Sequence, residues 1–244
     1  YTYASAINEA YANDGIRKPR YHEYEMNAFK TGAYPQYYPN VNWVDEVFKD
    51  AAATNIANMS LRGGGSKFRY FAMFNWVTDN GFIANAKAND GYSTQNKSSK
   101  ANLRTNLDID LTPSTKMTLN LLGTLAETNK PGDSADLWSM IYSLPATAFP
   151  VKTENGLWGG NTTWDGTKNP VAQSQAAAYT KGHNRSLYAD MTLKQDLSSI
   201  LPGLGAGFML AYDNWASYVE NHSKTYRYGS DNVQWKLSLI HISE

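Results

Sequence analysis

The sequence predicts an all-β fold that forms part of an antiparallel transmembrane β-barrel of the outer-membrane type, with long extracellular loops and a short N-terminal segment of helical and irregular structure. Three observations predict this fold. Apolar and polar residues alternate along several segments, which is the side-chain period of a strand. The clearest segments are about ten residues long, enough for a tilted strand to cross a bilayer, whereas strands of soluble sandwiches are more often about five or six residues long. Short and long connections also alternate along the chain, as they do in outer-membrane barrels.

The composition suits a membrane barrel and gives little support to several other classes. The 244 residues carry a net charge of zero, so no electrostatic feature points to nucleic acid. There is no cysteine, which excludes disulfides and thiolate chemistry. The mean hydropathy is −0.53 and no apolar run approaches the ~18 residues of a spanning helix, but alternating strands hide their apolar residues in a hydrophilic average. The 17 Tyr, 7 Trp and 8 Phe suit the aromatic girdles of a barrel or a sugar-binding surface.

Short helices and irregular structure are predicted for residues 1–54. Tyr3–Asp14 is rich in alanine and precedes Gly15, a residue type that commonly ends helices, so we expect a helix there. Arg17–Pro39 contains several proline and glycine residues and is expected to be irregular. Trp43–Phe48 is expected to form a short amphipathic helix.

The predicted strands alternate in polarity and lie between residues 55 and 236. Asn55–Arg62 and Lys67–Thr78 form the first pair around a turn at Gly63–Ser66. The hairpin Asn102–Ala126 has the strongest pattern, with a turn at Thr112–Thr115. Asn184–Leu197 and Leu204–Tyr218 repeat the alternation. The hairpin's apolar side chains, Leu107, Ile109, Leu119 and Leu121, are expected to face lipid, and the polar side chains expected to face an aqueous lumen are Arg104, Asn106, Asp108 and Asp110.

A long connection, Thr128–His183, holds the candidate binding residues. One helix is expected at Ser134–Leu144, and the rest is rich in Gly, Asn and Thr. Trp158, Trp164 and Tyr179 lie within it and are our candidates for substrate binding, because flat aromatic faces bind the apolar faces of sugars and loops often carry binding sites. The alternative interpretation is that these rings pack the loop or line the membrane interface.

The sequence contains no catalytic or metal-binding pattern. His22, His183, His222 and His241 are widely spaced, and we interpret each as a solvated loop residue. A polar lumen explains Asp108 and Asp110 more simply than acid–base catalysis does. We therefore expect no enzyme activity, no cofactor and no metal.

Both ends of the chain suggest a fragment. Tyr1-Thr2-Tyr3-Ala4 has neither the basic region nor the apolar core of a signal peptide. Residues 237–244 break the strand pattern and resemble a translated sequencing adapter, so we exclude this tail from the prediction of the fold. The chain is expected to be an internal part of a longer protein.

An ordered set of short motifs resembles the SusC/RagA family of TonB-dependent outer-membrane transporters. The set begins with the pattern Y-P-N-x-x-W-x-D-E, whose residues include Tyr38, Pro39, Asn40, Trp43 and Asp45. The pattern S-L-x-G-G follows with Gly63 and Gly64, then R-Y-F at Arg69–Phe71 and N-L-R-x-N-L-D-I-D at Asn102–Asp110. Gly65 departs from the family, which usually has two glycines at this turn rather than three. The resemblance covers nearly everything from Tyr3 to about Asp231.

The resemblance implies a 22-stranded barrel with an N-terminal plug, of which this chain would hold two parts. Residues 1–54 would connect the plug to the barrel, and residues 55–236 would form an early part of the barrel wall. It also implies partners: a SusD-like surface lipoprotein, TonB acting through the missing N-terminal part, and the lipid of the Gram-negative outer membrane. The implied cargo is an oligosaccharide or a peptide.

Two other classes remain open on the sequence alone. One is a soluble or surface-anchored β-sandwich module that binds glycans, which should have shorter strands and no systematic sidedness of its loops. The other is a glycoside hydrolase, which needs a suitably placed pair of carboxylates in a cleft.

Overall fold

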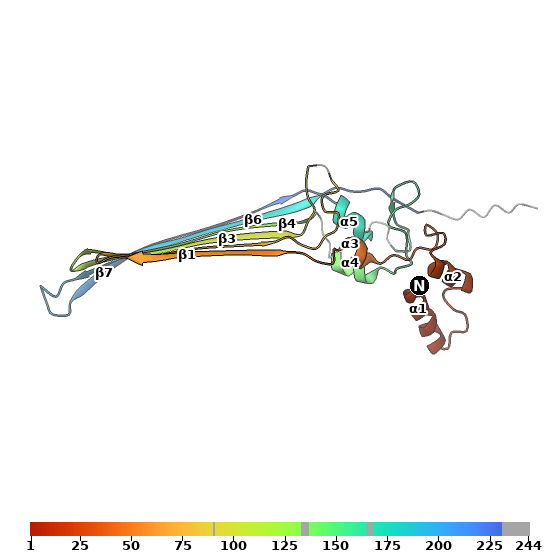
Figure 1. The fold of residues 1–244 in the computed structure, drawn as a ribbon, viewed down its shortest axis with the longest axis horizontal. Coiled ribbons are helices and arrows are strands. Elements are labelled where there is room, and N and C mark those ends of the chain that lie inside the picture. Colours follow the sequence, from red (N-terminus) through yellow and green to blue (C-terminus); the bar gives the residue numbers. More distant parts are fainter. Residues whose placement is uncertain (90, 133–136, 165–167, 231–244) are drawn as a thin grey trace, which may run out of the picture. The chain divides into compact units, whose positions relative to one another are not determined.

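The computed structural model describes residues 1–89, 91–132, 137–164 and 168–230. It is mostly antiparallel β-sheet with few helices, so the predicted all-β class is confirmed (Figure 1). The chain folds into two compact units. The helical unit contains residues 1–48 and the described residues of 134–177 and 224–244; the sheet unit contains the described residues of 49–133 and 178–223.

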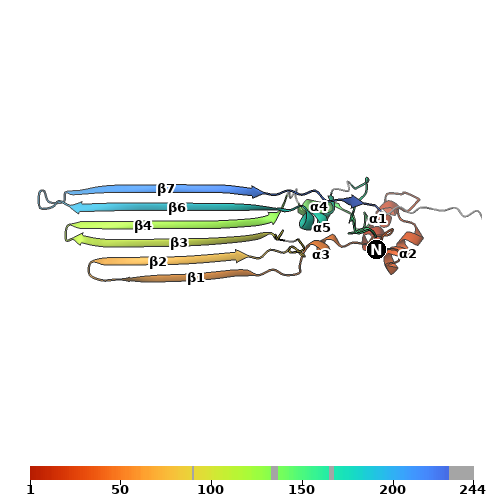
Figure 2. The ribbon, with the colours of Figure 1, turned by 90° about the horizontal axis from the view of Figure 1, so that it is seen from above.

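The sheet unit is built on one six-stranded sheet with the order β1-β2-β3-β4-β6-β7 (Figure 2). Each neighbouring pair of strands is antiparallel. The strands are β1 (Thr54–Gly64), β2 (Phe68–Asp79), β3 (Lys97–Thr112), β4 (Thr115–Pro131), β6 (Tyr179–Asp196) and β7 (Gly205–Asn221). They are 11 to 18 residues long and extend beyond the predicted bounds, because backbone pairing continues where the side-chain alternation fades.

Short connections meet at one end of this sheet and long ones at the other. Residues 65–67, 113–114 and 197–204 join consecutive strands at the end where Figure 2 shows the hairpin turns. Residues 80–96 and 132–178 make the long connections at the opposite end. The predicted alternation of short and long connections is therefore present and has the expected sidedness.

The glycines before the first turn are required by close contacts. A Cβ on Gly64 would lie 2.5 Å from the backbone oxygen of Phe68, and one on Gly63 would lie 2.8 Å from the hydroxyl of Tyr70. A Cβ on Gly65 would lie 3.8 Å from the Phe68 ring, which is an ordinary contact. The backbone contact therefore demands a glycine at position 64, a side chain at position 63 would require the Tyr70 ring to shift, and Gly65 is not sterically constrained. Gly63 and Gly64 belong to β1 rather than to the turn, which corrects the predicted turn at Gly63–Ser66.

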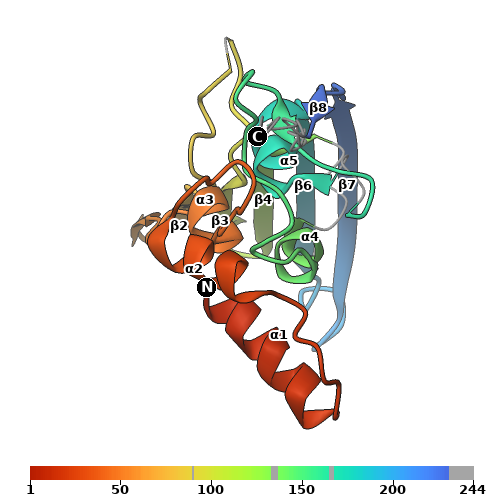
Figure 3. The ribbon, with the colours of Figure 1, turned by 90° about the vertical axis from the view of Figure 1, so that its right-hand side faces the viewer.

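The helical unit contains α1 (Thr2–Asn13), α2 (Glu23–Thr31), α3 (Trp43–Val47), α4 (Leu137–Ser143) and α5 (Pro170–Ala176), which Figure 3 shows, together with a two-stranded parallel pair, β5 (Trp158–Gly159) and β8 (Tyr228–Gly229). Its apolar core joins α3, α4 and α5 through Trp43, Val47, Ile141, Phe149 and Val171. Residues far apart in the sequence therefore share one small core, which buries side chains that a 48-residue segment could not bury alone.

The helical unit corrects two predictions. Arg17–Pro39, expected to be irregular, contains α2, whose first turn is capped by the Glu25 carboxylate accepting from the His22 backbone N–H at 2.7 Å. Gly32 ends this helix in the left-handed conformation. The long connection, expected to hold one helix, holds α4, α5 and β5. The predicted helices at Tyr3–Asp14 and Trp43–Phe48 are confirmed with nearly the expected bounds.

No described helix is both long and apolar enough to cross a membrane. The start of the helix expected at Ser134–Leu144 and the tail at 237–244 lie outside the described residues.

Candidate functional site

The six strands align their side chains into two faces of opposite character, and these two faces are the candidate functional site. Following the register from strand to strand places most large apolar side chains on one side, which we call the apolar face. Its members are Met59 and Leu61 of β1, Phe68, Tyr70, Phe74 and Trp76 of β2, Leu103, Leu107 and Ile109 of β3, Met117, Leu119, Leu121 and Leu125 of β4, Leu187, Met191 and Leu193 of β6, and Phe208, Leu210, Tyr212 and Tyr218 of β7.

The apolar face is exposed although it is continuous across all six strands. Leu125 is 62% exposed, Leu210 58% and Leu103 46%. A contiguous apolar surface of this extent marks a site of contact with lipid or with another protein surface, since scattered apolar residues are normal but large patches are not.

The height of the apolar face matches a bilayer. On β3 it runs from Ala101 to Leu111, ten residue steps, which at about 3.4 Å per step is about 34 Å along the strand. Strands in outer-membrane barrels tilt by about 35–45°, and at that tilt a stretch of this length would span about 24–28 Å along the membrane normal. The apolar band of such barrels is about 25 Å tall.

Aromatic side chains lie at both ends of the apolar face. Phe68 and Tyr70 stack at 6.4 Å near the short turns. Trp76 lies toward the long connections, where its indole N–H donates to the Ser99 hydroxyl at 3.2 Å, and Tyr218 stacks on His183 at 4.5 Å. Such rings, with one apolar surface and one polar group, are typical of membrane–water interfaces.

The opposite side, which we call the polar face, carries hydrogen-bonded ladders that cross the strands. Asn75 donates to Asn58, Asn102 donates to Asn75 at 3.0 Å, and the Thr124 hydroxyl donates to Asn102 at 3.0 Å, which links β1 through β4. The face is not uniformly polar. It also carries apolar and aromatic side chains from five strands: Ile56 of β1, Phe71, Met73 and Val77 of β2, Leu122 of β4, Tyr188 of β6, and Met209, Trp215 and Val219 of β7.

A second ladder crosses the sheet nearer the turns. Asn106 donates to Asn120, and Asn120 donates to the Asp190 carboxylate at 2.9 Å, which links β3, β4 and β6. Side-chain amides that satisfy one another in this way can line water without folding the sheet onto a core.

The four residues predicted to face the lumen share the polar face, as the alternation indicated. The Arg104 Nε donates to Asn106 at 3.2 Å, and the Thr118 hydroxyl donates to Asp108 at 2.8 Å. Asp110 lies opposite Lys116, and its Oδ1 is buried without a hydrogen-bond partner among the described residues. The sheet that carries these side chains is open, with β1 and β7 at its edges.

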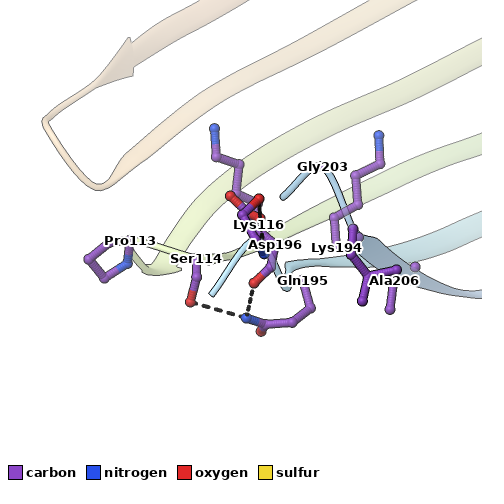
Figure 4. Close-up of a pocket in the computed structure, with 12 residues that line it drawn as sticks. Pro113, Ser114, Lys116, Lys194, Gln195, Asp196, Gly203 and Ala206 are labelled. Atoms are coloured by element: carbon purple, nitrogen blue, oxygen red, sulfur yellow. Dashed lines mark hydrogen bonds between the residues drawn. The ribbon is translucent and has the colours of Figure 1, made fainter. Parts of the chain in front are cut away.

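A hollow of about 620 Å³ lies at the turn end of the sheet, around the Pro113-Ser114 turn and the β6–β7 turn (Figure 4). Lys116 and Lys194 are directly opposite each other on β4 and β6, and Figure 4 shows their ammonium groups pointing to the same side. Gln195 points to the other side, where it donates to the Ser114 hydroxyl at 3.1 Å. The Asp196 carboxylate accepts from the Ser198 backbone N–H at 2.8 Å, so it stabilises the turn.

The three candidate substrate-binding residues differ in their surroundings. Trp158 in β5 packs on the core of the helical unit and lies under the Lys152 ammonium at 4.6 Å. Tyr179 begins β6 in the sheet unit, where its ring stacks on His222 at 4.6 Å and contacts Tyr92 at 5.2 Å. These contacts favour packing roles for both. Trp164 is 39% exposed, and among the described residues no ring or cation stacks on it.

The residues of the Y-P-N-x-x-W-x-D-E motif build the helical unit rather than a binding site. Trp43 is 3% exposed, donates from its indole N–H to the Pro145 oxygen at 3.1 Å, and packs edge-on against Phe149. Tyr38, at the start of the motif with Pro39, makes edge contacts with Tyr24 and Phe29.

The polar residues of the motif support the same segment. Asn40 donates to the Phe29 oxygen at 3.5 Å, and Asp45 in the first turn of α3 accepts from the Asn42 amide. The motif therefore ties residues 38–45 to the distant α4–α5 region through Trp43.

One of the histidines is not a loop residue, which corrects the interpretation of His183. His183 lies in β6, where it contacts the Glu127 carboxylate at 3.4 Å. His22 is exposed and lies just before α2, as its N-cap. His222 follows β7 and contacts Glu220 at 2.7 Å, and His241 lies outside the described residues. Among the described residues, no group of three or more His, Cys, Asp or Glu side chains is placed to hold a metal ion.

Sequence reasoning missed Asn58, Asn75 and Asp190 as parts of the polar ladders. The alternation placed Asn58 and Asp190 on polar faces of their strands, but only the pairing register aligns them with Asn102 and Asn120.

Neither models of known protein families nor curated proteins match the chain.

Proposed function

We propose that this chain forms part of the wall of an outer-membrane β-barrel transporter of the SusC/RagA type. In this proposal the apolar face contacts lipid, the polar face lines the lumen, the short turns lie in the periplasm and the long connections lie outside the cell. The chain would assist in importing an oligosaccharide or a peptide, with a SusD-like surface lipoprotein as lid and TonB as the source of energy. The residues of this chain would supply wall and loops and no chemistry.

The segregation of the two faces carries the proposal. Leu121 and Leu122 are neighbours in β4 with similar exposure, 36% and 39%, but Leu121 lies in a continuous apolar surface and Leu122 lies between Arg104 and Tyr188. A sheet with water on both sides has no reason to segregate exposed side chains in this way. A wall between lipid and water requires it.

The unpaired edges support closure by further strands. Within the described residues β1 and β7 each pair on one side only, and both are long and carry exposed apolar residues. Edges of this kind lead to aggregation in a soluble protein and are removed when a barrel closes.

The glycan-binding sandwich is less well supported. It would need a second sheet against the apolar face, and the described residues contain only the two-stranded pair β5–β8 besides the large sheet. Strands of 11 to 18 residues are also longer than those of most sandwiches.

Site-directed spin labelling tests the sidedness of the sheet. The chain has no cysteine, so Leu121→Cys and Leu122→Cys each create a single labelling site. In phospholipid vesicles, the label at position 121 should be more accessible to oxygen, which partitions into lipid, and the label at position 122 to a water-soluble nickel complex. Equal accessibility to the nickel complex at both positions would contradict a lipid-facing surface.

Transport itself is tested in cells. Deletion of the gene that encodes the chain should abolish uptake of one class of labelled oligosaccharide or peptide, and the intact gene should restore it. Unchanged uptake of both classes would contradict the cargo assignment without affecting the membrane assignment.

A further inference from the structure

Two hollows follow one another along the apolar face between β4, β6 and β7. The first, of about 380 Å³, lies near the middle of the face and is lined mainly by apolar side chains, including Leu119, Leu121, Met191 and Leu210. The second, of about 390 Å³, lies toward the long connections and combines apolar side chains, Leu125 and Tyr218, with polar and charged ones, Glu127, His183 and Arg185. An apolar hollow next to a charged one suits an amphiphilic ligand, whose apolar tail would lie in the first hollow and whose charged headgroup would lie in the second.

Gly123 leaves the space between the two hollows open. It lies on the apolar face of β4, between Leu121 and Leu125, and a Cβ added there would meet no atom within 4 Å. Neither crowding nor an unusual backbone conformation requires a glycine at this position. The missing side chain leaves room between the two hollows on β4, with Leu187 of β6 opposite Gly123, and we call the two hollows and the space between them the groove.

The groove has the length of one leaflet. From Met191 to Arg185 there are six residues along β6, about 20 Å along the strand and about 14–16 Å along the membrane normal at the tilt of a barrel strand. Half of the ~30 Å hydrocarbon core is about 15 Å.

The charged end of the groove is net positive. The carboxylates on this part of the apolar face are Glu127, which contacts His183 at 3.4 Å, and Glu220, which contacts His222 at 2.7 Å. The cations on the same face are Lys97, Lys181 and Arg185, of which Lys181 lies directly opposite Glu220 and over the Tyr179 ring at 4.9 Å. The cations outnumber the carboxylates even when both histidines are neutral.

The unpaired cation best placed for a ligand is Arg185. It lines the second hollow, is exposed, and makes no hydrogen bond or ion pair with the described residues. A guanidinium binds phosphate oxygens through parallel hydrogen bonds, and Lys181, four residues away on the same face, adds a second positive charge.

We propose that this groove binds a phospholipid whose headgroup has a net negative charge, with one acyl chain along the hollows and the anionic phosphate at Arg185 and Lys181. The inference rests on the proposed function, because it requires the apolar face to lie in a bilayer. The stacked rings of His183 and Tyr218 would lie at the level where the acyl chain meets the headgroup.

Electron spin resonance of spin-labelled lipids tests this site. The transporter that contains the chain is reconstituted in phosphatidylcholine vesicles that contain a trace of phosphatidylglycerol or phosphatidylcholine with a nitroxide on its acyl chain. The fraction of label that the protein immobilises gives the relative association constant of each lipid. The chain should select phosphatidylglycerol, and Arg185→Gln should lower that selectivity about fivefold.

Matched variants separate the site from general effects of charge and volume. Lys100→Gln removes a cation at nearly the same height on the polar face and should leave the selectivity unchanged. Gly123→Leu places a side chain in the groove at a position where the added Cβ meets no atom within 4 Å, and it should lower the selectivity. Ala211→Leu adds similar bulk on the polar face and should not.

Each outcome decides between the inference and its premise. Immobilised lipid without headgroup selectivity overturns the lipid site and leaves the membrane wall intact. Equal losses from Arg185→Gln and Lys100→Gln also overturn it, because net charge would then explain the selectivity. No immobilised lipid with the chain folded in the vesicles contradicts the proposed function itself.

Discussion

Replacing Leu121 or Leu122 by arginine distinguishes a membrane wall from a sheet with water on both sides. The two cases predict opposite orders for the losses in the free energy of unfolding of the two variants. The two leucines are adjacent in β4 and similarly exposed, at 36% and 39%, so the same substitution is made in the same strand on opposite faces. Leu121 is the midpoint of the apolar stretch Met117–Leu125, which places it near the bilayer midplane under the proposed function.

The two substitutions have different costs in lipid and in water. An arginine at the midplane of the lipid-facing surface costs about 2–4 kcal/mol. At position 122 the new arginine lies directly opposite Arg104, and opposed like charges cost up to about 1 kcal/mol. In a bilayer Leu121→Arg should therefore be the more damaging by about 1–4 kcal/mol, at least about fivefold in the folding equilibrium. In a sheet with water on both sides, Leu122→Arg should be the more damaging, because only it meets a like charge.

The assay is unfolding by urea in phosphatidylcholine vesicles, followed by tryptophan fluorescence and far-ultraviolet circular dichroism. The free energies of unfolding of the two variants are compared with that of the unmodified chain. Leu121→Gln and Leu122→Gln, which add polarity without charge, should show the same order with a smaller difference. A larger loss for Leu122→Arg than for Leu121→Arg would refute the assignment of the apolar face to lipid.

Three further predictions concern folding of the two units. Gly64→Ala should lower the free energy of unfolding by about 1–3 kcal/mol, because the added Cβ would lie 2.5 Å from a backbone oxygen. Its control, Gly65→Ala, should change the free energy of unfolding by less than about 0.5 kcal/mol. Equal urea midpoints for the two variants would refute the steric argument. Trp43→Phe should lower the free energy of unfolding by about 1–3 kcal/mol, because the buried Pro145 carbonyl oxygen loses its hydrogen-bond donor. Thermal unfolding measures this change, and an unchanged melting temperature would contradict the role of that hydrogen bond. Asn102→Val should remove two hydrogen bonds of the first polar ladder and lower the free energy of unfolding by about 1–3 kcal/mol. Amide hydrogen exchange in β2 and β4 should then become faster, and unchanged exchange would contradict the prediction.

The polar ladders show why register matters more than alternation for the candidate site. Alternation alone places Asn102 on the polar face of its strand, but its donor and acceptor partners, Asn75 and Thr124, lie on other strands. A shift of one residue in either pairing would reverse the faces and break the ladder. Local sequence cannot specify that alignment, because each strand carries the same period-two pattern.

The helical unit shows a second kind of information that is absent from local patterns. Trp43 is a conspicuous motif residue, but its partners Pro145 and Phe149 lie about a hundred residues away. The stretch around α2 looked irregular because prolines outweighed its end signals, Glu25 at the start and Gly32 at the end. Those two residues stabilise α2 locally, so a closer examination of the caps would have found it.

Local sequence patterns predicted most of each strand, the apolar and polar sides of the strands, and the alternation of short and long connections. These features depend on residues near one another in the chain, through side-chain period and turn chemistry. The pairing of the strands and its register are visible only in the folded sheet, and so is the alignment of the apolar sides into one face with a groove at Gly123. The tertiary structure also decided that Trp158 and Tyr179 pack against neighbouring side chains. The physical reason is that pairing and packing join residues distant in sequence, whose relative positions depend on the whole fold.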